Sequence, residues 1–160
     1  MTAPFQWRQP VTPEVINYVA QHMRESDKRE LEAMHGPCDV SALARLLGEW
    51  ANPDSPYNAT IAITDEHGVP AGICGCNGQT IWMLGTEELT STREHRRLLL
   101  VEGRKWVEEL LAEAGGPLHN YCLADNKESI RWLKALGFAF AEPQPMGPSG
   151  RLFRYFWRNN

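Results

Sequence analysis

The stretch DNKESIRWLKALGF, residues 125–138, holds a helix together with its start and its stop. Asn126 can cap the first turn, and Glu128 suits the positive end of the helix dipole. Gly137 can take the left-handed conformation that ends a helix. Apolar residues lie between these ends at the spacing of one helical face: Ile130, Leu133 and Leu136. The stretch therefore predicts an amphipathic helix followed by a strand.

Helical and strand patterns alternate along the rest of the chain in an order typical of an α+β protein. Further helices are expected over residues 12–23, 27–34, 39–50 and 91–116. Strands are expected over residues 4–8, 58–64, 69–76, 80–84, 117–123, 138–143 and 151–158. Asn77-Gly78 predicts a hairpin between two of these strands. The prediction is a single domain, residues 1–160, with a mixed, mostly antiparallel sheet of about six to seven strands flanked by helices.

Three helix starts can be assigned from capping residues. Thr12 is expected to cap the first helix, and Asp27 the second, with Glu30 placed three residues later. Ser91 with Glu94 has the spacing of a capping box at the start of the long helix.

Composition narrows the class of protein. The net charge of −4 argues against general nucleic-acid binding, and no apolar run is long enough to span a membrane. Because the start of the sequence also lacks an apolar signal core, we expect a cytosolic protein. Its four cysteines have no metal-site spacing and are expected to be free thiols, with no metal bound: Cys38, Cys74, Cys76 and Cys122.

The element order and the stretch at 125–138 together resemble the GNAT superfamily, the acetyl-CoA-dependent N-acetyltransferases. In that family the fifth strand leads into Asn-x-x-Ala/Ser and then a helix that closes on Gly-Phe. The matching positions are Asn126, Ser129, Gly137 and Phe138. The resemblance implies a GNAT-like fold and, if the protein is active, acetyl-CoA as cofactor.

A closer resemblance covers most of the chain. The segments HMRESDKRELEAMHG, IWMLGTEEL, LHNYCLADNKESIRWLKALGF and GRLFRYFWR resemble a family of small GNAT-like proteins of short-tailed bacteriophages. Genes of that family lie among virion-structure genes, and its members are associated with internal virion proteins and particle assembly. The resemblance implies a partner protein from the virion or the host, and a location in the host cytoplasm or with the virion.

The loop that would hold the pyrophosphate of coenzyme A departs from the family pattern. Active members use Gln/Arg-x-x-Gly-x-Gly/Ala, because glycines let main-chain N–H groups surround the phosphates. The matching segment, GTEELTSTREHRR, has no glycine after Gly85 until Gly103. Arg93 and Arg96 could bind phosphate through their side chains, and Asn126 is a further candidate for binding the cofactor. The alternative is that these arginines lie on the solvated first turns of a helix.

The catalytic groups are also incomplete. Active members commonly carry a tyrosine that protonates the leaving thiolate where this chain has Leu133, which cannot donate a proton. Tyr121 is a weak substitute, and His119 is the candidate general base, with Glu30 a weaker one. Cys122 could be a nucleophile but is more typical of a small core residue.

Two functions remain open from the sequence. In the first, a non-catalytic GNAT relative serves virion assembly or maturation through protein contacts, and the aromatic residues of 151–158 anchor an interface rather than bind nucleic acid. In the second, a divergent acetyltransferase modifies an amine. Main-chain N–H groups of residues 86–97 turned toward an open cleft would favour the enzyme, whereas acidic side chains or Trp82 in that cleft would favour the first function. The oligomeric state is not indicated.

Overall fold

The computed structural model describes residues 5–52 and 58–159. Within these residues, eight strands, five α-helices and one 3-10 helix follow one another in this order: β1 (Phe5–Gln9), α1 (Pro13–Gln21), α2 (Glu25–His35), α3 (Val40–Trp50), β2 (Asn58–Asp65), β3 (Pro70–Asn77), β4 (Thr80–Gly85), η1 (Glu87–Thr90), α4 (Arg93–Ala114), β5 (Leu118–Leu123), α5 (Lys127–Ala135), β6 (Ala139–Phe140), β7 (Gln144–Met146) and β8 (Arg151–Arg158). The fold is mixed α+β, as predicted from the sequence.

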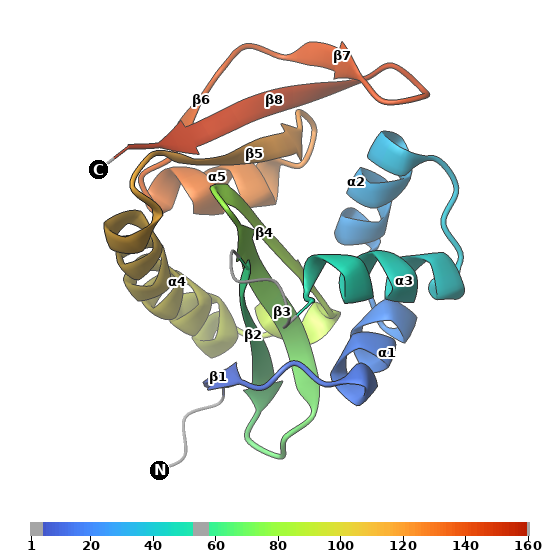
Figure 1. Cartoon of the computed structure of the whole chain (residues 1–160), viewed down its shortest axis with the longest axis vertical. Coiled ribbons are helices and arrows are strands. Elements are labelled where there is room, and N and C mark those ends of the chain that lie inside the picture. The colour runs from blue at the N-terminus through green and yellow to red at the C-terminus, as the bar shows by residue number, and fades with distance from the viewer. Residues whose placement is uncertain (1–4, 53–57, 160) are drawn as a thin grey trace.

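The sheet consists of two antiparallel halves joined by one parallel contact. Strands β1 to β4 form a meander in sequence order, and β5 pairs with β8, which carries β6 and β7 along its other edge. The two halves meet where β4 and β5 pair in parallel, at Thr80 and His119 alone. Beyond that point β5 turns away from β4, as Figure 1 shows, so the centre of the sheet opens.

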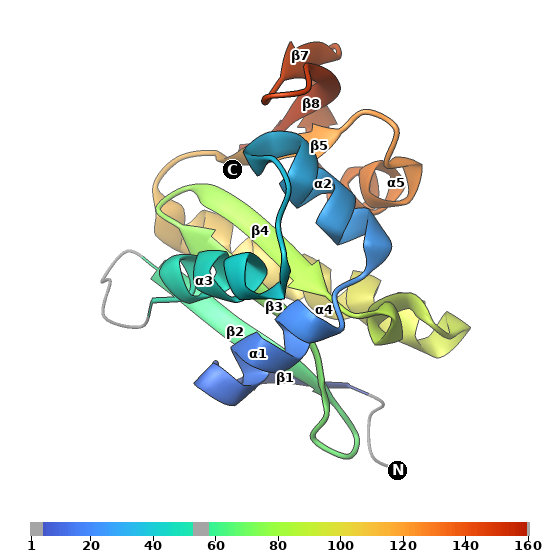
Figure 2. The same cartoon turned by 90° about the vertical axis from the view of Figure 1, so that its right-hand side faces the viewer.

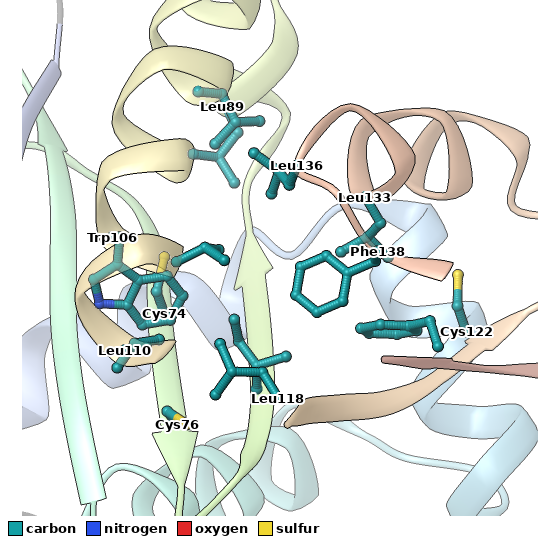
Figure 3. Packing of buried hydrophobic residues seen from close by; sticks show 14 of the residues in the cluster. Cys74, Cys76, Leu89, Trp106, Leu110, Leu118, Cys122, Leu133, Leu136 and Phe138 are labelled. Atoms are coloured by element: carbon teal, nitrogen blue, oxygen red, sulfur yellow. The ribbon is translucent and has the colours of Figure 1, made fainter. Parts of the chain in front are cut away.

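The helices cover both faces of the sheet. Figures 1 and 2 show α1, α2 and α3 on one side, with α4 and α5 on the other. Buried side chains of α4, β5 and α5 form a common core, and Figure 3 shows Trp106, Leu118 and Leu133 within it. The α2 helix lies at the open centre of the sheet, beside β4 and the end of β5 (Figure 2).

The helix predicted from residues 125–138 forms as expected. The Asn126 side chain accepts a hydrogen bond from the Ser129 N–H at 3.4 Å, and Gly137 has a φ of 95°. The predicted apolar stripe is buried: Ile130, Leu133 and Leu136. Phe138 follows and packs edge-on against Phe156, with ring centroids 5.3 Å apart.

The number of strands differs from the prediction of six to seven. The segment 138–143, expected as one strand, forms only the short β6. The β7 strand lies in the Pro-rich segment after it, where no strand was expected. Pro143 and Pro145 have no N–H to donate, which interrupts regular pairing here. Both short strands nevertheless pair with β8, because its long edge remains available to them.

Two of the predicted caps were wrong. Thr12 caps α1 as expected, with its hydroxyl 3.2 Å from the Val15 N–H. Asp27, however, lies inside α2, which begins at Glu25. The cap of α4 is Thr92 rather than Ser91, and Glu94 pairs with Arg97 instead of closing a capping box. The Asp27 carboxylate instead accepts hydrogen bonds from the Arg24 guanidinium and from the Gly85 N–H.

Candidate functional site

A cavity of about 370 Å³ lies where β4 and β5 diverge. Most of its wall is apolar, with contributions from Met83 and Leu84 of β4 and from Leu133 of α5. The α2 helix supplies the charged part of the wall, with Arg24 just before its first turn and Asp27 and Glu30 within it. This cavity is the candidate functional site, because a parting of neighbouring strands leaves main-chain groups that a ligand could bind.

On the β4 side, these main-chain groups are taken by the start of α2. The Gly85 N–H donates to Oδ2 of Asp27 at 2.8 Å, and the Gly85 carbonyl accepts from the Arg24 N–H, also at 2.8 Å. Asp27 is 4% exposed and both of its oxygens also accept from the Arg24 guanidinium at 3.0 Å. The charges of the Arg24–Asp27 pair thus compensate each other where water is largely excluded.

On the β5 side, the same helix contributes Glu30. Its Oε1 accepts from the Leu123 N–H at 3.1 Å, from Nδ2 of Asn126 at 3.0 Å and from the Cys122 thiol at 3.2 Å. Burial raises the pKa of Glu30, and the neighbouring negative charge of Asp27 raises it further, while the three donors act in the opposite direction. Glu30 therefore ties α2 to both β5 and the cap of α5.

The remaining N–H groups of β5 that face β4 also have partners within the chain. The His119 N–H donates to the Gln79 carbonyl at 3.0 Å, and the Tyr121 N–H donates to the Asn120 side chain at 2.7 Å. The Asn120 amide in turn donates across the gap to the Ile81 carbonyl at 2.8 Å. Together with Leu123, these alternate residues leave no N–H of β5 free toward the opening.

The segment 86–97 lies outside the lining of the cavity, and several of its N–H groups have partners within the chain. The Thr86 N–H donates to the Ala71 carbonyl, and the Glu88 N–H to the Thr86 hydroxyl. Leu89 is fully buried, and Nδ1 of His95 lies 2.7 Å from the Glu88 carbonyl. Of the residues between Leu84 and Gly103, none lines the cavity.

The three arginines of this segment lie at the surface. Arg93 is exposed in the first turn of α4, and Arg96 donates to the Thr90 carbonyl at 3.0 Å. Arg97 pairs with Glu94 at 2.8 Å. Asn126, the other residue predicted to bind the cofactor, is buried. Its side chain already accepts a hydrogen bond from the Ser129 N–H and donates one to Glu30. Cofactor binding by Arg93, Arg96 and Asn126 stays a prediction.

The candidate catalytic residues on β5 share one face of the sheet. The rings of His119 and Tyr121 both contact Tyr155, with centroids 5.8 Å and 5.2 Å apart. Tyr121 lines the cavity, whereas His119 lies outside its lining. Cys122 is buried, and both burial and the nearby Glu30 raise the pKa of its thiol, which keeps it protonated and poorly nucleophilic. Catalytic roles for His119 and Tyr121 also stay predictions.

Sequence reasoning missed the importance of Arg24 and Asp27. A partial signal was present, because Arg24, Asp27 and Glu30 recur every three residues from the residue that precedes α2 into the helix. Residues at this spacing lie along one side of a helix, and charged side chains that become buried there need partners. The partners themselves, on β4 and β5, are more than fifty residues away in the sequence.

Solved structures of acetyltransferases share this fold. Ribosomal-protein-S5-alanine acetyltransferase from Vibrio fischeri superposes with a TM-score of 0.67 at 12% identity, covering 100% of this chain and 95% of its own. Spermidine N-acetyltransferase from Vibrio cholerae, in complex with CoA and spermine, superposes with a TM-score of 0.66 at 6% identity. The match covers 98% of this chain and 96% of the enzyme. The microcin C7 self-immunity acetyltransferase MccE, in complex with acetyl-CoA and AMP, superposes with a TM-score of 0.65 at 11% identity. This match covers 98% of the present chain and 92% of MccE. The protein therefore has the GNAT fold.

The family is narrower than the fold. Residues 60–144 match the model of the family described as "Bacteriophage T7, probable scaffold protein Gp13", which covers more than half of the sequence. The chain belongs to this family and is a GNAT-like phage protein. No curated protein sequence matches it. Among the described residues, no helix is both long and apolar enough to cross a membrane.

Proposed function

We propose that this protein acts without acetyl transfer, through protein contacts in the assembly or maturation of a phage particle. The observation that carries the proposal is the position of α2 at the opening between β4 and β5. Asp27 and Glu30 accept from the N–H groups of Gly85 and Leu123, so these two donors are already engaged within the chain. A thioester ligand bound there would have to displace carboxylates from good hydrogen bonds.

Two features of the sequence support the same proposal. The segment 86–97 lacks the glycines of a phosphate-binding loop, and its N–H groups at Glu88 and His95 bond to side chains of the same segment. Leu133 lines the cavity where active members commonly carry the tyrosine that protonates the thiolate. Membership of a phage scaffold family supports a role in particle assembly, with virion proteins as the partners.

Isothermal titration calorimetry with acetyl-CoA tests this proposal. We expect no measurable heat at millimolar acetyl-CoA from protein whose cooperative unfolding shows that it is folded. Spermidine N-acetyltransferase from Vibrio cholerae, which has the same fold, serves as a positive control in the same buffer. Micromolar binding that is lost in Arg93→Ala/Arg96→Ala would overturn the proposal and assign these arginines to the cofactor.

A divergent N-acetyltransferase is the second candidate function, and the position of Glu30 in the cavity wall favours it. This carboxyl lines the cavity, and its raised pKa is the kind of shift that a general base working near neutral pH needs. Tyr121 lines the same cavity and is the candidate acid. Acetyl transfer to an amine or protein acceptor, lost in both Glu30→Gln and Tyr121→Phe, would establish this second function.

A further inference from the structure

We propose that a basic surface formed by α5 and β8 docks an acidic segment of a partner protein. The surface consists of Lys127, Arg131, Lys134 and Arg154, and we call it the α5 basic surface. The inference rests on the proposed function, since it assumes that the protein works by binding another protein. It concerns a part of the molecule outside the cavity between β4 and β5, because none of these four residues lines that cavity.

The four cations are brought together by one helix face and the strand beside it. Lys127, Arg131 and Lys134 recur at intervals of four and three residues, so they lie in one row along α5. All three are exposed, and with Arg154 they surround a shallow hollow floored by Ala124 and Ile130. The row from Lys127 to Lys134 is about 10 Å long, a length that a short helix or extended segment with two or three carboxylates would match.

In the part of the chain that the structure describes, none of these cations has a carboxylate partner in direct contact. Other surface arginines have carboxylate partners, among them Arg151 with Asp125 and Arg158 with Glu108. No ion pair within 4.0 Å involves the four residues of the α5 basic surface in residues 5–52 and 58–159. A row of unpaired like charges costs repulsion in the free protein, and an acidic partner would relieve that repulsion.

Two of the cations are already held in place. The Arg154 guanidinium donates to the Ala141 carbonyl at 2.8 Å and lies 5.2 Å from the centre of the Phe140 ring. The ammonium group of Lys134 lies 5.9 Å from the centre of the same ring. Positioned side chains lose less conformational freedom when a ligand binds, which favours a defined acidic partner over loose counter-ions.

The charge of the whole molecule favours a protein partner over nucleic acid. Without these four cations, the sequence has 12 Lys and Arg against 20 Asp and Glu, a net charge of −8. A long nucleic acid would be repelled by the negative charge of the rest of the molecule. A short acidic segment of a protein can dock on the α5 basic surface alone. The surface is therefore assigned to an Asp- or Glu-rich segment.

Fluorescence anisotropy with a short fluorescein-labelled peptide of alternating Glu and Ser tests the assignment. The peptide is titrated with wild type, with Lys127→Glu/Arg131→Glu, and with Arg29→Glu/Arg45→Glu as the matched control. The two variants change the net charge equally, and all four replaced residues are exposed, so neither variant removes a core contact. We expect about tenfold weaker binding in the α5 variant, near wild-type affinity in the control, and weaker binding as salt rises from about 50 to 200 mM.

Other results would overturn the assignment. An equal loss of peptide affinity in both variants would show that binding depends only on the net charge of the protein. No binding of the peptide to wild type at low salt would remove the docking site, while leaving the proposed non-catalytic function to the acetyl-CoA titration. A labelled DNA oligonucleotide that binds more tightly than the peptide, and depends on Lys127 and Arg131, would assign the surface to nucleic acid instead.

Discussion

Asp27 and Glu30 lie one turn apart on α2 and accept hydrogen bonds from two different strands. Asp27 binds the Gly85 N–H at the end of β4, and Glu30 binds the Leu123 N–H at the end of β5. The strands have diverged by this point, so the carbonyl groups of one strand cannot accept hydrogen bonds from the N–H groups of the other. One helix turn thus supplies acceptors for N–H groups at the ends of both strands.

The buried ion pair at the base of α2 gives the first prediction. Asp27→Asn leaves the Arg24 guanidinium without its countercharge in a largely buried place, and we expect a loss of about 3 kcal/mol in the free energy of unfolding. The double variant Arg24→Met/Asp27→Asn should lose less than the sum of the two single variants, because the uncompensated charge is gone. Urea unfolding of all four proteins measures this coupling, and strictly additive losses would contradict it.

Glu30 gives the second prediction, through the three donors it satisfies. Glu30→Ala leaves the Leu123 N–H and the Asn126 amide without an acceptor, and we expect a loss of about 2 kcal/mol in the free energy of unfolding. Glu30→Gln keeps an acceptor oxygen of the same size and serves as the matched control. Amide hydrogen exchange at Leu123 should accelerate in the alanine variant only. Equal exchange in both variants would mean that Leu123 does not depend on this contact.

The raised pKa of Glu30 gives a prediction about pH. Because the folded protein holds this proton to a higher pH than the unfolded chain, protonation of Glu30 favours the folded state. Its contribution to stability is therefore full below the ordinary carboxyl pKa of 4.5 and is lost as pH rises through the raised value. Relative to Glu30→Gln, wild type should lose stability over this window, by at most about 1.4 kcal/mol per pH unit. Parallel stability curves for the two proteins would show that the pKa is not raised.

Gly85 gives a prediction about close packing at the end of β4. A Cβ atom at this position would lie 2.1 Å from Cδ1 of Leu89 and 2.8 Å from the Ala71 carbonyl oxygen. Since the main chain of Ala71 cannot move aside as a flexible side chain can, we expect Gly85→Ala to lose about 2 kcal/mol in the free energy of unfolding.

Gly48 provides the control for this substitution. It lies within α3, and an added Cβ would meet no atom within 4 Å. Gly48→Ala should therefore stabilise the protein by up to about 1 kcal/mol, through the higher helix propensity of alanine. A thermal unfolding series of the two variants beside wild type separates steric conflict from loss of glycine flexibility. A stabilised Gly85→Ala variant would contradict the packing seen at Leu89.

Local sequence determined most of the elements, because the signals that specify them act over a few residues. The cap at Asn126, the apolar stripe through Leu133 and the stop at Gly137 predict α5 without any tertiary information. Asn77-Gly78 likewise predicts the β3–β4 hairpin, where Gly78 has a φ of 64°. The family could also be inferred from motifs in order along the chain, and the family match over residues 60–144 confirms it.

Only the tertiary structure decided what occupies the centre of the molecule. Asp27 has the residue type and spacing of a helix cap, yet it binds Gly85, 58 residues away, and Glu30 binds Leu123 across 93 residues. A sequence pattern records which groups can accept a hydrogen bond, but not which distant donor will be left without one. That donor exists because β4 and β5 part after a single point of pairing, and the packing of helices on both faces of the sheet brings α2 to meet it.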